Sequence, residues 1–288
     1  MNKQPLVSVV ITTYNRTKYI KRAVESVLAQ TYKNIEIIII DDNSTDGTYK
    51  IISEFNNRDL RIVILKNKTN LGSYRSLNKG IRISKGTYIA NLDDDDIWFD
   101  VKKIEKQVNF LEEDKNYGLV GGGVIKIDED GKEIIRYLSP ENDKEIRKTI
   151  LIDNAFAHST VLFRKEVWEK VGGYNKLFDY AADIDLWLKI GKISKFYNFQ
   201  EYFIYYLEKE QDNDHNMRND SFRRKVRLNI KLRRRHRNHY PGYGKAFLLC
   251  WASYFYSFLP FRQRLRPILF KLRKLILGPP SYKYFKKN

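Results

Sequence analysis

Four short apolar runs mark the first hundred residues, and they restrict the possible fold more than any other feature. The runs are Val7–Ile11, Ile35–Ile40, Arg61–Leu65 and Thr87–Leu92. Each is rich in Ile, Val or Leu, and each is continuous rather than alternating between apolar and polar residues. Continuous runs of this length are typical of strands buried on both faces, as in a parallel sheet. We therefore expect four buried strands.

Segments with helical periodicity separate these runs. Tyr19–Gln30 has apolar residues at helical spacing, a helix capped by Ser44–Asp46 is expected to continue to about Phe55, and Leu71–Ser84 fills the third gap. Strands and helices in alternation predict a doubly wound α/β domain.

Beyond residue 100 this alternation ends, and an α+β elaboration that makes the sheet mixed is predicted. The expected elements are a helix at Val101–Glu113, a strand at Gly118–Ile127, a turn at 128–131, a strand at His158–Phe163, and helices at Lys165–Val171 and Asp183–Ile190. This half would close over one edge of the sheet.

That edge is polar. The first predicted strand ends in Thr12–Asn15, the second in Asp41–Ser44 and the fourth in Asp93–Asp96. In open α/β sheets ligands bind at the carboxyl ends of the strands. We therefore place the functional site there.

The run Asp93–Asp96 is the strongest local signal. Side chains alternate along an extended segment, so Asp93 and Asp95 share a face. Two carboxylates held together favour a cation between them, and Mg²⁺ or Mn²⁺ prefers such oxygen ligands. The alternative is a helix N-terminus surrounded by solvated acids. Four acids exceed what a cap needs, so metal binding is the favoured interpretation.

A second acidic pair follows the second predicted strand. Asp41 and Asp42, with Ser44 and Asp46, suit either recognition of a base or ribose or capping of the next helix. Both uses are compatible: we expect Asp46 to cap and Asp42 to point into the site.

Four strings in this order resemble the family 2 inverting glycosyltransferases with a GT-A fold, of the type that builds bacterial cell-surface polysaccharides. They are VSVVITTYNR, IEIIIIDDNSTDGT, GTYIANLDDDDIW and DYAADIDLWLKI, and the resemblance covers about residues 5–210. It implies nucleotide binding by Thr12, Tyr14, Asn15, Asp42, Asp93 and Asp94. It also implies a D-x-D element in which Asp95 is the first candidate metal ligand and Asp93 the second, and a catalytic base at Asp183.

The chemistry agrees with the role of Asp183. Inverting transfer needs a carboxylate that takes the proton of an acceptor hydroxyl on one face of the sugar. A metal ion on the diphosphate would offset the charge of the leaving group on the other face. The family commonly has Glu directly before the base, whereas this chain has Ala182. A capping role for Asp183, and Asp185 as the base instead, are the alternatives.

Three further candidates are less specific. His158 falls in a segment that the resemblance places near the acceptor, and a packed structural role is equally compatible with it. His215, in the polar stretch QDNDHNMRND, is a further candidate for the metal or the diphosphate, although a solvated loop explains it as well. Arg75 could contact phosphate or simply be an exposed helical residue.

The charge of the chain breaks sharply at Asp220. Up to that residue there are 34 Lys and Arg against 35 Asp and Glu, and beyond it there are 19 Lys and Arg and no carboxylate. We therefore divide the chain into a catalytic domain at 1–215 and a basic, amphipathic helical tail at 216–288. Apolar residues of 246–261 and one face of Arg262–Leu277 predict contact with an anionic membrane through residues 223–277. A helix docked on the domain is the alternative, and nucleic acid is disfavoured by the long apolar segment.

The cellular location follows from absences in the sequence. Cys250 is the only cysteine, so no internal disulfide forms and a reducing compartment is expected. No signal-peptide pattern and no run of 18 apolar residues occurs. These features predict a cytoplasmic protein, peripheral on the inner face of the plasma membrane.

The resulting hypothesis is a metal-dependent, non-processive hexosyltransferase. It would use Mn²⁺ or Mg²⁺, a nucleotide-sugar with UDP as the expected nucleotide, and a saccharide acceptor, polyprenyl-linked in this hypothesis. A nucleotidyltransferase on a similar core would need a glycine-rich, basic loop where this chain has TTYNRT. An inactive binding or scaffolding protein would not need acids at positions 42, 93, 95 and 183.

Overall fold

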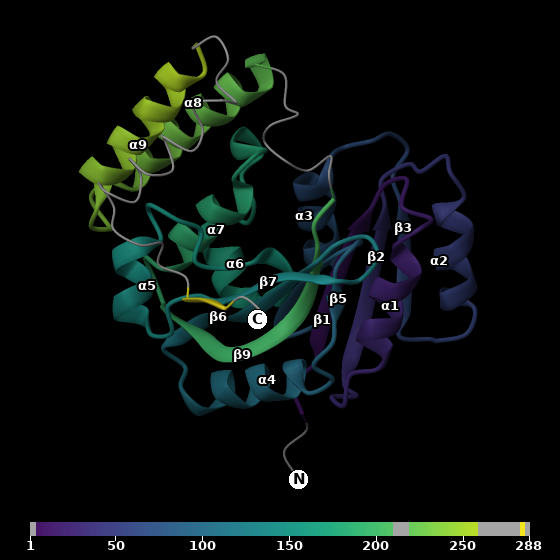
Figure 1. Cartoon of the computed structure of the whole chain (residues 1–288). Helices are drawn as coiled ribbons and strands as arrows, with labels where there is room; N and C mark the ends of the chain where they lie inside the picture. Colours follow the sequence, from purple (N-terminus) through teal and green to yellow (C-terminus); the bar gives the residue numbers. More distant parts are fainter. Residues whose placement is uncertain (1–3, 210–218, 259–282, 286–288) are drawn as a thin grey trace.

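The computed structural model describes residues 4–209, 219–258 and 283–285 (Figure 1). The strands of its first half are β1 (Val7–Thr13), β2 (Ile35–Asp41), β3 (Ile62–Lys66), β4 (Tyr88–Asp93) and β5 (Ile97–Trp98). The helices between them are α1 (Ile20–Leu28), α2 (Thr48–Asn56) and α3 (Ser73–Ile83). The four predicted strands and three predicted helices are therefore confirmed, with their ends shifted by a few residues.

The second half and the tail contain mixed elements. The strands are β6 (Tyr117–Ile127), β7 (Glu133–Leu138), β8 (Leu162–Arg164), β9 (Lys195–Leu207) and β10 (Lys283–Phe285). The helices are α4 (Lys103–Glu113), α5 (Asp143–Thr149), α6 (Lys165–Val171), α7 (Ala182–Ile190), α8 (Asn219–His236) and α9 (Tyr243–Tyr256), with 3₁₀ turns η1 (His158–Thr160) and η2 (Lys176–Phe178).

One mixed sheet connects the two halves. Its order is β10-β7-β6-β8-β4-β1-β2-β3, and β9 joins it by pairing with β6 and β5. β1 lies between β2 and β4 and is parallel to both, with Thr12 level with Asp93 and Thr13 level with Asp41. The predicted polar strand ends therefore meet at one edge of the sheet.

The core is divided by the sheet into two layers. Ile38 and Ile40 pack in the layer that contains α3 and α7, whereas Ile37 and Ile39 pack in the layer that contains α1 and α4. Both faces of the strand are thus buried, which explains why its sequence does not alternate. At Gly80 of α3, a Cβ atom would lie 2.6 Å from Ile40 Cδ1, so only glycine lets the helix approach this closely.

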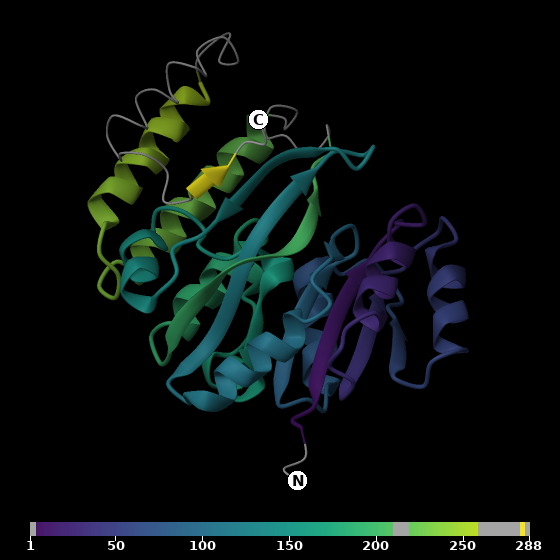
Figure 2. The same cartoon turned by 60° about the horizontal axis from the view of Figure 1, so that its bottom comes forward.

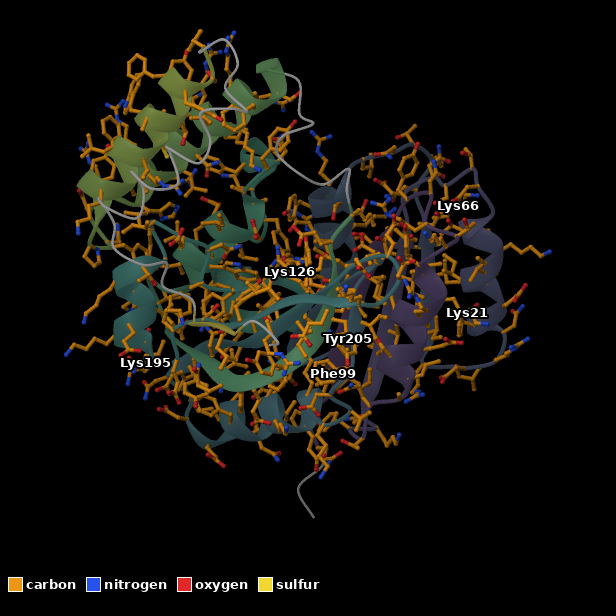
Figure 3. The ribbon with its side chains drawn as sticks, viewed as in Figure 1. Lys21, Lys66, Phe99, Lys126, Lys195 and Tyr205 are labelled. Atoms are coloured by element: carbon orange, nitrogen blue, oxygen red, sulfur yellow. The ribbon has the colours of Figure 1, made fainter. Side chains whose placement is uncertain are left out.

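The second half lies beside the first and extends its sheet, and the long strand β9 is strongly curved (Figures 1 and 2). β6 and β9 run parallel over most of their length, and the register between them shifts at Gly121–Val124. Near the end of β9, Tyr205 stacks on Phe99 with ring centroids 4.6 Å apart (Figure 3). β9 and α5 were not predicted from the sequence. The strand predicted at His158–Phe163 was partly wrong, because its first three residues form η1 and only Leu162–Arg164 pair with β4 and β6.

The first part of the tail docks on the domain. Leu232 of α8 and the following Tyr240 belong to the core layer that contains α7, and the Tyr240 hydroxyl donates to the carbonyl of Leu188 at 2.8 Å. His236 and Asp185 are fully buried together, with His236 Nε2 3.0 Å from Asp185 Oδ1. α9 packs along α8 (Figure 1). The predicted amphipathic segment Arg262–Leu277 and the candidate His215 both lie outside the described residues.

The buried pair gives a stability prediction. Replacing His236 by Ala leaves the Asp185 carboxylate buried with only Lys189 Nζ, 3.5 Å away, and we expect a loss of about 3 kcal/mol of unfolding free energy. Burial lowers the pKa of His236 below its ordinary value. The stability that neutral His236 contributes is therefore present above pH 6.5 and is lost as the pH falls through its lower folded pKa.

Denaturant titrations at pH 7.5 and 5.5 measure both effects, with the exposed His239→Ala as the control. The loss of stability on acidification is expected to be smaller in His236→Ala than in His239→Ala. Equal stabilities of the two variants at pH 7.5 would show that the pair does not hold α8.

Candidate active site

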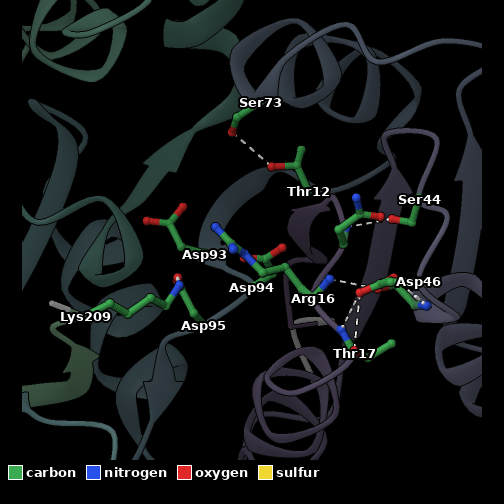
Figure 4. A network of polar contacts seen from close by, with 12 residues as sticks. Thr12, Arg16, Thr17, Ser44, Asp46, Ser73, Asp93, Asp94, Asp95 and Lys209 are labelled. Atoms are coloured by element: carbon green, nitrogen blue, oxygen red, sulfur yellow. Dashed lines mark hydrogen bonds and ion pairs between the residues drawn. The ribbon is translucent and has the colours of Figure 1, made fainter. Parts of the chain in front are cut away.

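The loop after β1 is tied to the loop after β2 by Asn15. This residue has a positive φ of 53°, its backbone N–H donates to Ser44 Oγ at 3.0 Å, and its Oδ1 accepts from the Thr45 N–H at 2.8 Å (Figure 4). Asp46 was predicted to cap α2, but the N-cap position is occupied by Gly47; Asp46 lies one residue earlier and accepts the N–H of Thr48, the first residue of α2, at 3.0 Å. Asn15 thus fixes the loop shape, and its contact with a nucleotide stays a prediction.

Two other predicted nucleotide-binding side chains lie around this loop. Thr12 Oγ1 is 3.0 Å from Ser73 Oγ, which joins the end of β1 to the start of α3 (Figure 4). The Tyr14 side chain is 44% exposed, so a ring face is available for stacking with a base. Both residues lie at the edge where the polar strand ends meet, and their nucleotide contacts stay predictions.

Asp42 is buried and positions the segment before α3. Its carboxylate accepts from the N–H groups of Leu71 at 2.9 Å and Gly72 at 2.8 Å, from Asn67 Nδ2 at 2.7 Å and from Ser76 Oγ at 3.1 Å. Gly72 has a φ of 85°, which glycine adopts without strain. In this structure the carboxylate therefore shapes the wall of the site, and its contact with a nucleotide stays a prediction.

Each side chain of the acidic run Asp93–Asp96 contacts a different partner. Asp94 Oδ1 lies 3.3 Å from Arg16 Nε, and the Asp95 carboxylate pairs with the ammonium of Lys209 (Figure 4). Asp96 is fully inside the fold, where it accepts from Ser159 Oγ at 2.5 Å. Asp93, at the end of β4, takes His158 as its partner.

The charges of this run are incompletely balanced by the protein. Burial, together with the neighbouring Asp95, raises the pKa of Asp94 to about 6. Burial, followed by Asp93 and Asp95, raises the pKa of Asp96 well above its ordinary value. Acids that raise one another's pKa favour a bound cation.

The donor set fits a hard divalent ion. Asp93 and Asp95 offer carboxylate oxygens, which Mg²⁺ and Mn²⁺ prefer. Among residues 4–209, 219–258 and 283–285, no three side chains of His, Cys, Asp or Glu gather in a metal-binding group. An ion here would therefore complete its coordination with substrate phosphates and water, as Mg²⁺ commonly does.

Asp183 lies in the first turn of α7. Its Oδ2 accepts from Asn154 Nδ2 at 2.8 Å, and burial raises its pKa above the ordinary value although His158 opposes the rise. Asp185 points the other way, into the buried pair with His236. This orientation favours Asp183 over Asp185 as the base. Ala182, at the position where the family commonly has Glu, is fully buried.

His158 pairs with the acidic run and lies near Asp183, the candidate base. Its Nδ1 lies 2.8 Å from Asp93 Oδ1, and its Nε2 lies 2.9 Å from the Tyr174 hydroxyl. Burial would lower the pKa of His158, but Asp93 and Asp183 outweigh it and the pKa is raised. The same pairing holds the pKa of Asp93 below its ordinary value despite burial. His158 thus pairs directly with Asp93 and lies close enough to Asp183 for the charge of each to affect the other.

The remaining candidates lie elsewhere, and sequence reasoning missed two cations. Arg75 is exposed on α3. Arg16 could have been found, since it directly follows the polar end of β1 in TTYNR. Lys209 carried no local signal, because it reaches Asp95 only through the curl of β9.

Comparison with known proteins identifies the relatives of this site. The model of "Glycosyl transferase family 2" matches residues 8–172, which include β1, β2, β4 and His158. The chain belongs to glycosyl transferase family 2.

Among curated family 2 relatives, the uncharacterised glycosyltransferase MJ1057 of Methanocaldococcus jannaschii is 35% identical over 73% of this chain and 73% of its own length. The putative glycosyltransferase EpsE of Bacillus subtilis is 36% identical over 74% of this chain and 76% of its own length. The function of this family 2 member is therefore glycosyl transfer.

Solved structures show the same fold. S. aureus TarS 1–349, in complex with UDP-GlcNAc, has a TM-score of 0.65 over 94% of this chain and 77% of that chain, at 17% identity. The mannosyltransferase PcManGT of Pyrobaculum calidifontis, in complex with GDP-Man and Mn²⁺, has a TM-score of 0.62 over 97% of this chain and 78% of that chain, at 16% identity. The predicted GT-A fold of this family 2 glycosyltransferase is confirmed.

Proposed function

We propose that this glycosyltransferase transfers a hexose from a UDP-sugar, with inversion and with the help of a divalent metal, to a hydroxyl of a lipid-linked saccharide used in surface polysaccharides. The observation that carries the proposal is the convergence of Asp93 and Asp183 on His158 at the carboxyl edge of the sheet. A donor-side acid and a candidate base thereby lie close to the same histidine, which is compatible with a single displacement.

Asp183 is the group that takes the acceptor proton. Asn154 donates to Asp183 Oδ2, and the backbone N–H of Ile184 also donates to this carboxylate; both hold it in place to accept from the hydroxyl of the acceptor. The raised pKa of Asp183 makes it a stronger base than an ordinary aspartate. The acceptor oxygen then bonds to the anomeric carbon as the bond from that carbon to the diphosphate breaks. Asp183 keeps the proton, and the nucleoside diphosphate leaves with the bonding electrons.

Asp95, with Asp93 as the second candidate, would hold the metal. When bound, Mn²⁺ or Mg²⁺ would offset the negative charge on the departing diphosphate. Two cations of the chain lie at the same edge, Arg16 beside Asp94 and Lys209 beside Asp95. Both could also offset negative charge on the departing diphosphate.

The choice of UDP rests on the likeness to S. aureus TarS in complex with UDP-GlcNAc. The exposed ring of Tyr14 beside Thr12 suits a flat nucleobase, which is compatible with uridine. GDP stays the alternative, since PcManGT was solved with GDP-Man. No helix among the residues that the structure describes has the length and hydropathy of a membrane span.

The tail would hold the enzyme peripherally on the inner face of the plasma membrane. Leu248, Phe255 and Phe258 are exposed on or just after α9, and Arg223 lies over the Phe258 ring at 4.0 Å. Aromatic and basic side chains together suit the interface of an anionic membrane, where each basic residue contributes about 1 kcal/mol.

Flotation with vesicles tests this attachment. We expect the full chain to float with vesicles that contain anionic lipid, and Phe255→Ser/Phe258→Ser to float less. Leu60→Ser/Ile83→Ser changes two exposed apolar residues outside the tail and is the matched control. If the full chain stays in the soluble fraction, the membrane attachment is wrong.

The transfer itself is tested by nucleotide release from a panel of UDP-, GDP- and dTDP-sugars, with Mn²⁺, Mg²⁺ or EDTA. A polyprenyl-linked acceptor extract is added in one arm. Release from one UDP-sugar that requires both metal and extract is the expected result. Release that is unchanged by EDTA would refute the metal dependence, and no release from any donor would favour a scaffolding protein.

A further inference from the structure

A groove with an unusual charge lies beside the candidate active site. It has a volume of about 780 Å³ and is lined by residues of α3, of the segment that follows α6, of α7 and of the end of α8. Its lining contains six cationic residues and no Asp or Glu. The six are Arg75, Lys79 and Arg82 of α3, Lys176 after α6, Lys189 of α7 and Arg235 of α8.

Of the six cations, only Lys189 has an acidic partner among the residues that the structure describes. Lys79 Nζ donates to Asn67 Oδ1 at 2.8 Å, and Lys189 lies 3.5 Å from Asp185. The other four are exposed, and within the described part of the chain none has an acidic partner. Burial lowers the pKa of Lys189, and the positive charge of Arg235 adds to this effect. Like charges brought together from separate elements favour an anion between them.

The groove shares a wall with the candidate site. Tyr174 lines the groove, and its hydroxyl contacts His158 Nε2 at 2.9 Å and accepts from Asn91 Nδ2 at 2.5 Å. Tyr174 therefore lies between the groove and His158, the partner of Asp93. The groove lining contains none of the donor-side candidates Asp93–Asp95, and for this reason we assign the groove to the acceptor.

We propose that this groove binds the diphosphate of a lipid-linked acceptor. The inference rests on the proposed function and deepens it by naming the acceptor group that the enzyme recognises. A volume of about 780 Å³ exceeds what one phosphate fills and lies within the usual range of small-ligand sites. Arg235 is on α8, which packs against the aromatic-rich α9, so the wall that would hold the diphosphate belongs to the same helix pair as the proposed lipid-facing surface.

The test uses the full chain and two triple variants with equal charge change. The groove variant is Arg82→Gln/Lys176→Gln/Arg235→Gln, and the control is Lys50→Gln/Arg58→Gln/Lys85→Gln, three exposed cations outside the groove. Calorimetry with inorganic pyrophosphate in EDTA is expected to show affinity reduced about tenfold or more in the groove variant and unchanged in the control. Equal affinities of the two variants would overturn the proposal.

Vesicles separate the possible sources of the anion. The groove variant should bind more weakly than the unmodified chain to phosphatidylcholine vesicles doped with a polyprenyl diphosphate. Its binding to vesicles doped with phosphatidylglycerol to the same charge should be unchanged. Equal loss on both would show a general attraction to anionic lipid and would overturn the proposal.

A third arm measures UDP binding in the presence of Mn²⁺. Unchanged UDP affinity in the groove variant is expected, and a loss parallel to that of pyrophosphate would assign the groove to the donor instead. If the unmodified chain fails to bind UDP with Mn²⁺, the proposed function fails, while the pyrophosphate result still decides the groove.

Discussion

Asp183→Asn is expected to lower kcat by about a thousandfold while the affinity for UDP and Mn²⁺ stays the same. The substitution keeps the size of the side chain and its contact with Asn154, but it removes the group that accepts the acceptor proton. General base catalysis contributes roughly 10²- to 10⁴-fold in enzymes, which sets the expected size of the loss. Initial rates of sugar transfer, with calorimetric titration of UDP, measure the two quantities separately.

The matched control is Asp185→Asn, two residues further along the same helix. Asp185 is fully buried against His236, so this variant should lose stability and keep most of its kcat. Full activity of Asp183→Asn with loss of activity in Asp185→Asn would reverse the assignment of the base.

The same group sets the pH dependence. Burial raises the pKa of Asp183 above its ordinary value of 3.8, and only the deprotonated carboxylate acts as a base. The rate is therefore expected to fall as the pH decreases through this raised pKa, so the acidic limb of kcat/KM should lie above the range of an ordinary aspartate.

Asp95→Asn is expected to weaken Mn²⁺ binding about a hundredfold, because it removes one of the two candidate carboxylate ligands. Without the metal, this carboxylate pairs with Lys209. Titration of Mn²⁺ followed by electron paramagnetic resonance, with UDP present, measures this directly. Transfer activity should fall in parallel and recover in part at high Mn²⁺ concentration.

Asp96→Asn provides the control within the same run. The raised pKa of Asp96 keeps this carboxyl neutral at higher pH than an ordinary aspartate, and it lies inside the fold against Ser159. The amide is close in shape to the neutral acid, so Mn²⁺ affinity should change little. Equal weakening in both variants would mean that the run binds cations by its total charge rather than through Asp95.

The first half of the fold could be predicted because each of its elements carries a local pattern. Ile37–Ile40 are buried on both sides of the sheet, so an uninterrupted apolar run was sufficient to place β2. β9 could not be found in this way. Its thirteen residues alternate irregularly between buried and partly exposed positions, because the strand bends along β6 with shifts of register.

The site was predictable where its residues end strands and not where distant segments meet. Asp93 and Asp95 follow an apolar run, and Asp183 lies in the string DYAADIDLWLKI, which resembles a motif of family 2 glycosyltransferases. The link from Asp93 through His158 to Tyr174 depends on the turn η1, which was expected to be a strand. The choice between Asp183 and Asp185 needed α8, whose His236 lies 51 positions beyond Asp185.

The most direct test of the central claim is the anomeric configuration of the product. Once the donor panel has identified the sugar, proton NMR of the product made from an α-linked nucleotide donor gives the configuration of the new bond. A single displacement with Asp183 as base produces only the β-linked product. An α-linked product would contradict the account, because retention requires a different arrangement of catalytic groups around the anomeric carbon.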